Sequence, residues 1–264
     1  MKNYALITGA SSGMGLEYAR QLASVGWNII LVSNREDENR RAATDIASRY
    51  GVKTHPYYID LTDTDAAQRL YNYTRNNGLQ VDILINNAGM LLFSPLERTA
   101  PERLDTIVAL HCATPMKLCR LFATDMRARR YGYVLIMSSI TAWTPYPTIS
   151  HYSASKAFLR TFGRALWYEM RDYGVGVTTV FPSAVDTPFY NLDDKMRRRL
   201  LRCGVMMSAS SVARKALRAM FRRRRSCLPG FLTKVEAALC ATMPAWVLLP
   251  ILKIPAVRRI LEKV

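Results

Sequence analysis

The chain of 264 residues has little of what disulfide-stabilised and metal-binding proteins need. It contains three histidines and five cysteines, and no two cysteines form a C-x-x-C pair. The odd number leaves one cysteine over, and we predict no metal site. Since most of the cysteines lie in apolar runs, we expect buried free thiols and a reducing, cytoplasmic location. The five are Cys112, Cys119, Cys203, Cys227 and Cys240.

The sequence also lacks a leader segment and a long apolar run. The first predicted strand begins at Tyr4, with a glycine-rich loop directly behind it, so we expect no signal peptide. The uncharged stretch in the tail, residues 237–252, is short for a membrane-spanning helix, and Pro244 and Pro250 interrupt it. We therefore expect no transmembrane helix.

Negative charge is scarce. The chain has 20 acidic residues against 37 basic ones, a formal net charge of +17, and the basic excess is concentrated in the last third. Such a field attracts anions, including phosphorylated cofactors, acidic carriers and acidic lipids. No basic groove interleaved with aromatic residues is present, so nucleic acid is not an expected partner.

What the sequence does have is an alternation of short apolar strands with helical segments. Strands are predicted at residues 5–7, 28–32, 54–59, 81–85, 133–137, 175–181 and 228–230. Helices are predicted up to residue 25 and at 36–50, 63–76, 101–129 and 151–172, with Thr99 as the N-cap of the fourth. This order predicts one α/β domain: a Rossmann-type, doubly wound parallel sheet with helices on both faces.

Three glycines stand between the first strand and the first helix. The segment Thr-Gly-Ala-Ser-Ser-Gly-Met-Gly, residues 8–15, has the spacing G-x-x-x-G-x-G. Glycines allow a tight turn and close backbone approach to a pyrophosphate, and the helix N-terminus behind them supplies N–H donors. A glycine turn alone can serve packing, but its place after the first strand of a βαβ unit predicts nucleotide binding.

Tyr152 and Lys156 are four residues apart in a segment with helical periodicity, so their side chains share one helix face. A buried ammonium beside a phenol favours the phenolate, and would lower the pKa of the tyrosine from its usual value of about 10. Ser139 follows the strand at 133–137 and faces the same helix. The two hydroxyls can hold a carbonyl oxygen between them, which predicts proton transfer to a substrate oxygen.

The glycine loop, Asn-Asn-Ala-Gly at residues 86–89, Ser139 and the Tyr152–Lys156 pair together resemble the motif set of the short-chain dehydrogenase/reductase family. Order and spacing match over about residues 3–190, and the tail resembles the DltE-like and the hydroxysteroid or 3-oxoacyl reductase branches. The resemblance implies that Tyr152 is the general acid or base, that Lys156 lowers its pKa and binds ribose, and that Ser139 positions the carbonyl oxygen.

The resemblance also implies a set of cofactor-binding residues. In chain order they are Gly9, Ser11, Ser12, Gly13, Met14, Gly15, Asn34, Arg35, Asp60, Leu61, Asn87, Ala88, Gly89, Tyr152, Lys156, Pro182, Val185 and Thr187.

The end of the second strand bears on the choice of nicotinamide cofactor. A carboxylate there would bind the ribose hydroxyls and repel a 2′-phosphate. The chain instead has Ser33, Asn34 and Arg35, and a guanidinium pairs well with a phosphate. Glu36 follows directly, and Arg35 is also compatible with an ordinary surface position. We predict NADP(H) in preference to NAD(H).

Two positions depart from the family pattern. His111 stands where the family usually has a catalytic asparagine, and it either holds a proton-relay water or is a core histidine without a role. Ser183 follows Pro182 where the family has glycine, which leaves the conformation of that loop open.

By resemblance, we expect an NAD(P)H-dependent oxidoreductase that moves a hydride between nicotinamide and a ketone or secondary alcohol. The substrate is expected to be apolar, either steroid-like or fatty-acyl-like, and lipid metabolism is the expected setting. The residues expected around it are Met90, Leu91, Phe93, Trp143, Tyr146, Phe189 and Tyr190. The alternative is a catalytically weak nucleotide-binding sensor or scaffold of the same fold. A homodimer or homotetramer is expected.

We divide the chain into a nucleotide-binding and catalytic domain, residues 1–229, and an apolar and basic helical tail, residues 230–264. Lys234 and Lys253 lie on either side of the uncharged stretch. The tail therefore forms a lid over the substrate site, lies peripherally on an anionic membrane, or completes the core or an oligomer contact.

Overall fold

A computed structural model describes residues 3–143, 148–187, 194–204 and 206–242. Tyr146, Phe189 and Tyr190, which we expected near the substrate, lie outside these ranges, as does the tail from residue 243.

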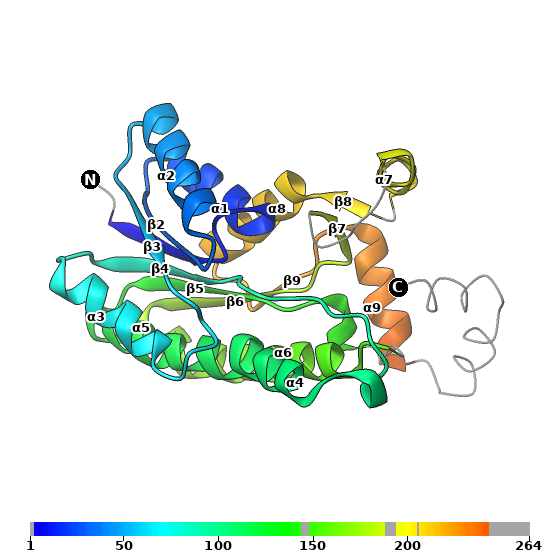
Figure 1. The fold of residues 1–264 in the computed structure, drawn as a ribbon. Helices are drawn as coiled ribbons and strands as arrows, with labels where there is room; N and C mark the ends of the chain where they lie inside the picture. Colours follow the sequence, from blue (N-terminus) through cyan, green and yellow to red (C-terminus); the bar gives the residue numbers. More distant parts are fainter. Residues whose placement is uncertain (1–2, 144–147, 188–193, 205, 243–264) are drawn as a thin grey trace.

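Seven parallel strands form the central sheet (Figure 1). Their order is β3-β2-β1-β4-β5-β6-β9, so the chain runs outward from β1 in one direction, then crosses back and continues in the other. The strands are β1 (Tyr4–Thr8), β2 (Asn28–Ser33), β3 (Thr54–Tyr58), β4 (Val81–Asn86), β5 (Gly132–Met137), β6 (Val175–Val180) and β9 (Ser226–Cys227). In a sheet of this kind ligands bind beyond the carboxyl ends of the strands, where the order reverses between β1 and β4.

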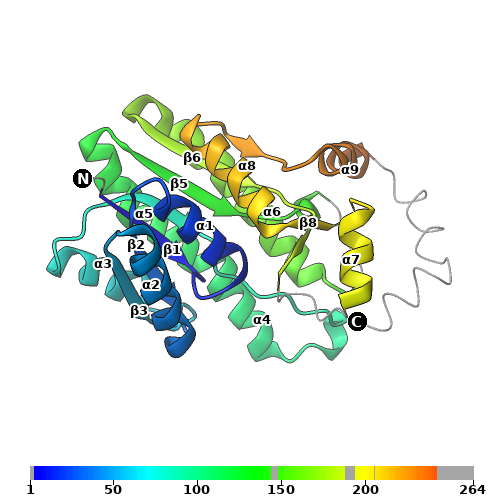
Figure 2. The same cartoon turned by 90° about the horizontal axis from the view of Figure 1, so that it is seen from above.

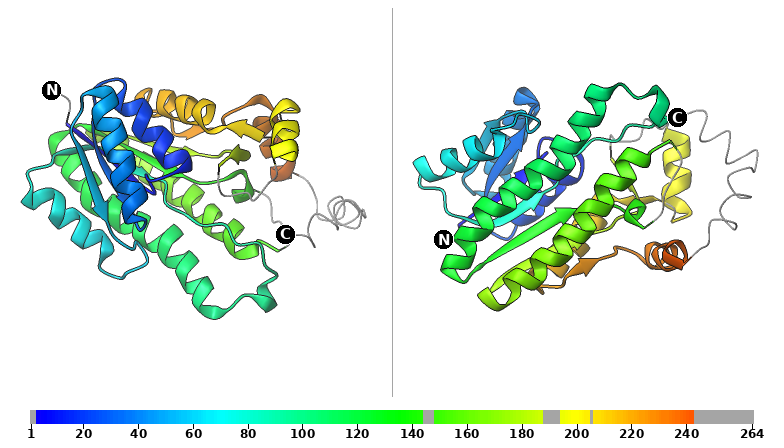
Figure 3. Two further views of the ribbon diagram at one scale, coloured as in Figure 1. Left: turned by 45° about the horizontal axis from the view of Figure 1, so that its top comes forward. Right: turned by 90° about the horizontal axis from the view of Figure 1, so that it is seen from below.

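Helices cover both faces of the sheet. One face carries α1 (Gly13–Ala23), α2 (Glu36–Tyr50) and α8 (Ala209–Phe221), and the other carries α3 (Ala66–Asn76), α5 (Thr114–Arg129) and α6 (Ser150–Met170). Figure 3 shows α5 and α6 running side by side along the second face. Successive strand residues alternate between the two cores: Ile7 packs with α1, and Leu6 with the opposite layer. The predicted doubly wound α/β fold is confirmed.

The remaining elements lie mostly beyond the carboxyl ends of the strands (Figure 2). They are the short parallel pair β7 (Ala184–Asp186) and β8 (Met206–Ser208), with α4 (Pro101–Val108), α7 (Asp194–Arg202) and α9 (Phe231–Thr242). Single helical turns η1 (Leu96–Arg98), η3 (Ile140–Ala142) and η4 (Arg171–Tyr173) complete the order. In the described part of the chain, none of the helices combines the length and apolarity that a membrane crossing requires.

The helix predicted at 101–129 is interrupted. A π-helical turn, η2 (Ala109–Ala113), separates α4 from α5 and contains His111. Such turns often mark functional sites. The predicted N-cap is wrong: Ala100 holds that position, and the Thr99 hydroxyl donates to the Pro95 carbonyl instead.

Two further expectations are corrected. The last strand lies at Ser226–Cys227 and not at 228–230, because its ladder is set by Thr179 and Val180 of β6. Cys203 is exposed at the end of α7, whereas Cys119 and Cys227 are buried, as expected.

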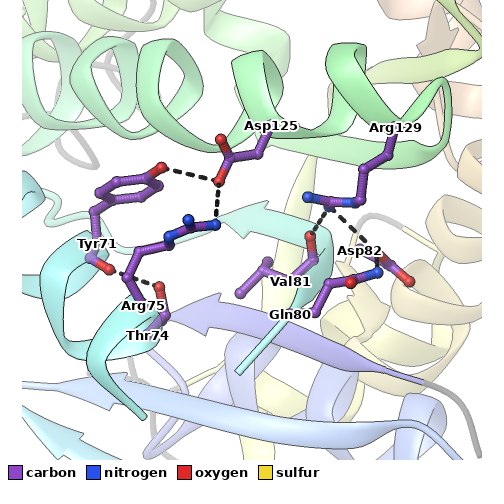
Figure 4. Close-up of polar contacts among 8 residues, drawn as sticks. All are labelled: Tyr71, Thr74, Arg75, Gln80, Val81, Asp82, Asp125 and Arg129. Atoms are coloured by element: carbon purple, nitrogen blue, oxygen red, sulfur yellow. Dashed lines mark hydrogen bonds and ion pairs between the residues drawn. The ribbon is translucent and has the colours of Figure 1, made fainter. Parts of the chain in front are cut away.

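An ion pair between the partly exposed Arg129 and the buried Asp82 anchors α5 at the amino end of the sheet (Figure 4). Arg129 donates to the Val81 carbonyl at 2.9 Å and to the Asp82 carboxylate at 3.3 Å. Asp82 is almost fully buried and also accepts from Asn3 at 2.7 Å. The contact fixes α5 at this end, opposite the π-helical turn.

Candidate active site

The glycine loop has the conformation that its sequence demands. Gly9 and Gly13 have φ of 66° and 54°, in the left-handed region that suits glycine. A Cβ at Gly15 would overlap the Gly9 carbonyl, so only glycine lets α1 begin this close to β1. The first N–H groups of α1 therefore face the space beyond β1 and form a site for anionic groups.

Thr8 ties this loop to the end of β4. Its hydroxyl donates to the Ile85 carbonyl at 3.3 Å and accepts from the N–H groups of Asn87 and Ala88, both at 2.9 Å. The Asn87 side chain donates back to the Thr8 carbonyl at 2.9 Å. These bonds hold the two loops together at the point where the strand order reverses.

One cavity of about 650 Å³ runs along this edge. Of the residues predicted at the site, those on its wall are Gly9, Ser11, Ser12, Gly13, Met14, Asn34, Arg35, Asp60, Leu61, Asn87, Ala88, Gly89, Ser139, Tyr152, Lys156, Pro182, Val185 and Thr187. Gly15 and His111 lie behind the wall. The cavity is elongated over β1, β2, β4 and β5, and its glycine-lined end meets the N-terminus of α1, which fits a dinucleotide.

Ser139, Tyr152 and Lys156 meet on this wall, from η3 and α6. The Lys156 ammonium lies 5.4 Å from the centre of the Tyr152 ring and donates to the Met137 carbonyl at 3.1 Å. Ser138 donates to the Lys156 carbonyl at 2.8 Å, which joins the end of β5 to α6. Ser139 accepts from the Thr141 N–H at 3.2 Å and keeps its own proton available to a ligand.

Burial controls the ionisation of Lys156. The side chain is 5% exposed, and desolvation lowers its pKa to about 8. A smaller opposing effect comes from Cys112. Lys156 is therefore mostly charged at neutral pH but titrates within the range in which enzymes are assayed.

His111 is enclosed behind Gly89. Its Nε2 accepts from the Met90 N–H at 2.9 Å, and its Nδ1 lies 2.8 Å from the Ser155 hydroxyl. Because Nε2 is an acceptor, the proton must be on Nδ1, which donates to Ser155. A Cβ at Gly89 would lie 3.0 Å from this ring, so a larger residue there would require the imidazole to shift by a few tenths of an ångström.

The His111 ring also packs edge-on against Tyr152, with the ring centres 5.7 Å apart. Desolvation, with a smaller contribution from Lys156, holds the pKa of His111 well below its ordinary value. The imidazole is neutral, fully hydrogen-bonded and in contact with the tyrosine, whereas the sequence left open whether it holds a water or is a core residue.

The end of β2 presents no carboxylate to the cavity. Arg35 lines it and forms an ion pair with Glu38 at 3.2 Å. Glu36 pairs with Arg40 at 2.6 Å on the surface of α2 and does not line the cavity. Ser33 donates to Ser11 at 2.9 Å, which links β2 to the glycine loop.

Sequence reasoning missed part of the wall. The additional residues are Ser33, Ile59, Thr62, Arg103, Thr106, Leu110, Met137, Ser138 and Ser183. Arg103, Thr106 and Leu110 recur at helical spacing on α4 and η2, which is a signal that the sequence carried. Of the described residues expected around the substrate, Met90 lines this cavity, Trp143 lines a second one, and Leu91 and Phe93 line neither.

Ser183, which stands in place of the usual glycine, connects the site to α9. Its hydroxyl donates to the Glu236 carboxylate at 3.0 Å. Pro182 holds the same loop by accepting from the Ile140 N–H at 3.0 Å. The loop beside Ser139, Tyr152 and Lys156 is thus fixed from η3 on one side and from α9 on the other.

Comparison with known proteins gives one family. The model of the short chain dehydrogenase family matches residues 3–198. The very-long-chain 3-oxoacyl-CoA reductase of Phaeosphaeria nodorum is 35% identical over 188 residues, which cover 70% of this chain and 55% of that protein. The 17-beta-hydroxysteroid dehydrogenase type 3 of Mus musculus is 35% identical over 206 residues, covering 75% of this chain and 65% of that protein. The chain thus spans about half the length of the 3-oxoacyl-CoA reductases that it matches.

Solved structures agree on the fold. A short-chain dehydrogenase from Sphingobium yanoikuyae in complex with NADPH is 24% identical with a TM-score of 0.78, covering 92% of this chain and 97% of that one. A 7beta-hydroxysteroid dehydrogenase is 22% identical with a TM-score of 0.84, covering 91% and 92%.

Proposed function

The chain belongs to the short-chain dehydrogenase family, and on that premise we propose that it is a reductase of ketone groups in fatty-acyl substrates, with NADPH as the hydride donor. The observation that carries the proposal is the meeting of Ser139, Tyr152 and Lys156 on the wall of a cavity that begins at the glycine loop. The names of the relatives support a 3-oxoacyl or steroid substrate.

The proposed chemistry divides between the cofactor and the protein. Bound NADPH supplies the hydride that reaches the carbonyl carbon. The Ser139 hydroxyl donates a hydrogen bond to the carbonyl oxygen and fixes its position. Tyr152 gives its phenolic proton to that oxygen, so the product is a secondary alcohol and the tyrosine is left as phenolate until solvent restores the proton.

Lys156 and His111 act on Tyr152 in different ways. The Lys156 charge stabilises the phenolate, and its ammonium would also bind a ribose hydroxyl of the cofactor. His111 does not reach the cavity, so we assign it a positioning role: it ties the Met90 loop to the first turn of α6, which carries Tyr152.

The preference for NADPH rests on the end of β2. Arg35 lies on the wall, and the nearest carboxylates are turned away or paired: Glu36 binds Arg40, and Glu38 binds Arg35 itself. A 2′-phosphate would meet a guanidinium there, with no carboxylate from the strand to repel it.

We also propose a peripheral membrane contact through α9. Phe231 is 79% exposed, and Leu232 and Val235 are exposed beside it. A Cβ at Gly204 would lie 3.7 Å from Leu232, which places the end of the basic helix α7 against α9. Apolar and basic side chains on one surface are typical of helices that lie in an anionic membrane interface.

The test of the proposed function is oxidation of NADPH, followed at 340 nm, with a panel of 3-oxoacyl thioesters and steroid ketones. The expected result is turnover of a 3-oxoacyl thioester that depends on Tyr152. Cofactor binding without turnover of any carbonyl compound would instead favour a nucleotide-binding sensor.

A further inference from the structure

A second cavity, of about 310 Å³, lies between α6, β6 and β9 and is lined by three arginines. Arg160 and Arg164 come from α6, and Arg225 comes from the segment before β9. One helix and one sheet edge thus bring three guanidinium groups to the same cavity, although the arginines are far apart in the sequence. Thr179 of β6 also lines it.

The charge of these arginines is not compensated by neighbours. Among the described residues, no carboxylate forms an ion pair with any of the three. Arg225 donates to the Tyr168 hydroxyl at 3.1 Å, and Arg164 bonds the same hydroxyl. The two cations hold the pKa of Tyr168 below its ordinary value, with the Arg164 bond as the larger cause.

A buried polar atom accompanies the charges. The Thr179 side chain is 2% exposed, and its hydroxyl has no hydrogen-bond partner within the described part of the chain. This oxygen is enclosed and faces Gly163 of α6, where an added Cβ would overlap it, so the arginines and not this hydroxyl determine which ligand the cavity selects. Three cations select an anion with several oxygens, and phosphate suits the planar fork of arginine.

The cavity is connected to the active site through the chain, since neighbouring residues of the same segments line the two cavities. Trp143 and Phe181 pack together on the wall of the arginine cavity, with ring centres 4.3 Å apart, and Arg160 lies over Trp143 at 5.1 Å. Trp143 directly follows η3, which begins next to Ser139, and Phe181 precedes Pro182 on the wall of the first cavity. At about 1.5 Å of rise per residue, Arg160 and Arg164 lie roughly 12 and 18 Å along α6 from Tyr152.

We propose that this arginine cavity binds the phosphate groups of a coenzyme A thioester whose 3-oxo group lies at Tyr152. The inference rests on the proposed function and adds that the fatty-acyl substrate is bound through the phosphate groups of its coenzyme A part. Coenzyme A carries its phosphates at the far end of a long pantetheine arm, so the anions are held well away from the reacting carbonyl. A steroid has no such group and would leave the arginines without a partner.

Binding of coenzyme A to the NADPH-loaded protein tests the site without requiring turnover. Isothermal titration compares coenzyme A, pantetheine and inorganic phosphate in the wild type and in Arg164→Gln and Arg225→Gln. We expect coenzyme A to bind at least tenfold more tightly than pantetheine, and each substitution to weaken coenzyme A binding about tenfold. Arg49→Gln, at the exposed end of α2, removes the same charge elsewhere and should change nothing.

Kinetics with two substrates that share one carbonyl separate the cavity from the chemistry. Acetoacetyl-CoA and acetoacetyl-pantetheine have the same pantetheine arm and differ only in the phosphate-bearing part. In Arg164→Gln, we expect the KM for acetoacetyl-CoA to rise about tenfold with kcat unchanged, and both constants for acetoacetyl-pantetheine to stay as in the wild type. Arg164→Lys should restore part of the loss.

The outcomes distinguish the two proposals. Equal KM values for the two thioesters in the wild type, together with no effect of the arginine substitutions, would overturn the coenzyme A site and leave the reductase proposal standing. Arginine-dependent binding of coenzyme A without any turnover would support the site and contradict the reductase proposal. Coenzyme A binding no tighter than inorganic phosphate, or a need for a carrier protein in its place, would also overturn the inference.

Discussion

The Nδ1 atom of His111 lies 2.8 Å from the hydroxyl of Ser155, which itself donates to the Tyr152 carbonyl at 2.7 Å. The other ring nitrogen accepts from the Met90 N–H. A single neutral imidazole thus joins the loop after β4 to the first turn of α6. The orientation of Tyr152 therefore depends on a residue that does not face the cavity.

Substitution of His111 tests this connection. We expect His111→Leu to lower the free energy of unfolding by about 1–3 kcal/mol, because the Met90 N–H and the Ser155 hydroxyl lose their partner in a buried site. The value of kcat should fall as well, while His111→Asn, which keeps a donor and an acceptor, should retain most of the activity. Thermal unfolding and steady-state kinetics measure the two effects. Unchanged kcat in His111→Leu would mean that the residue serves packing only.

A single substitution, Arg35→Glu, should reverse the cofactor preference. NADPH should bind more tightly than NADH, and Arg35→Glu should favour NADH because it places a repulsive charge against the 2′-phosphate. Titration of each cofactor into both proteins measures this. The matched change Glu38→Gln releases Arg35 from its ion pair, so it should tighten the binding of NADPH and leave the binding of NADH unchanged. Equal affinities of the wild type for both cofactors would rule out the assignment of Arg35.

The affinity for NADPH should fall as pH rises through about 8. Desolvation lowers the pKa of Lys156 to about 8, so the ammonium that we propose binds the ribose is present below this pH and is lost above it. In titrations from pH 6.5 to pH 9.5, the affinity for NADPH should decrease with the pH dependence of a single titrating group. Lys156→Met should bind more weakly at every pH and without this step. A pH-dependent decrease that survives in Lys156→Met would assign the proton to another group.

The α9 surface should give salt-sensitive binding to anionic liposomes. Basic residues near an anionic surface contribute about 1 kcal/mol each and weaken with salt, and burial of apolar side chains adds a part that salt does not affect. Flotation with anionic and neutral liposomes, for the wild type and Phe231→Ser, measures both parts. Binding that resists an alkaline carbonate wash would contradict a peripheral contact. No binding to either liposome would favour α9 as a lid, and truncation after Gly230 should then weaken substrate affinity.

Much of the fold could be predicted because local signals agreed with the tertiary structure. The helix expected at residues 36–50 begins and ends at those residues in the structure. The strands expected at 28–32 and 81–85 are each one residue longer, as β2 and β4. The π-helical turn was not predicted, and His111 within it bonds to residues that are distant in the chain, a contact that local periodicity does not reveal. The register of β9 likewise depends on β6.

The wall of the first cavity was predictable where a motif marks it. Residues whose place depends on the packing of α4, such as Arg103, were missed because helical spacing alone does not say which face meets a ligand. Nothing in the sequence brought Arg225 to Arg160 and Arg164, because only the pairing of β9 with β6 places that segment beside α6.

The most direct test of the proposed chemistry is the rate of NADPH oxidation in the variant Tyr152→Phe, measured with a 3-oxoacyl thioester that the wild type reduces. The substitution removes one hydroxyl and keeps the ring that packs against His111, so folding and the Kd for NADPH should remain within about twofold of the wild type. We expect kcat to fall by a factor of about 1,000 or more, since the proton donor is lost while the cofactor is still held. A variant that retained most of its kcat would show that Tyr152 does not protonate the substrate oxygen.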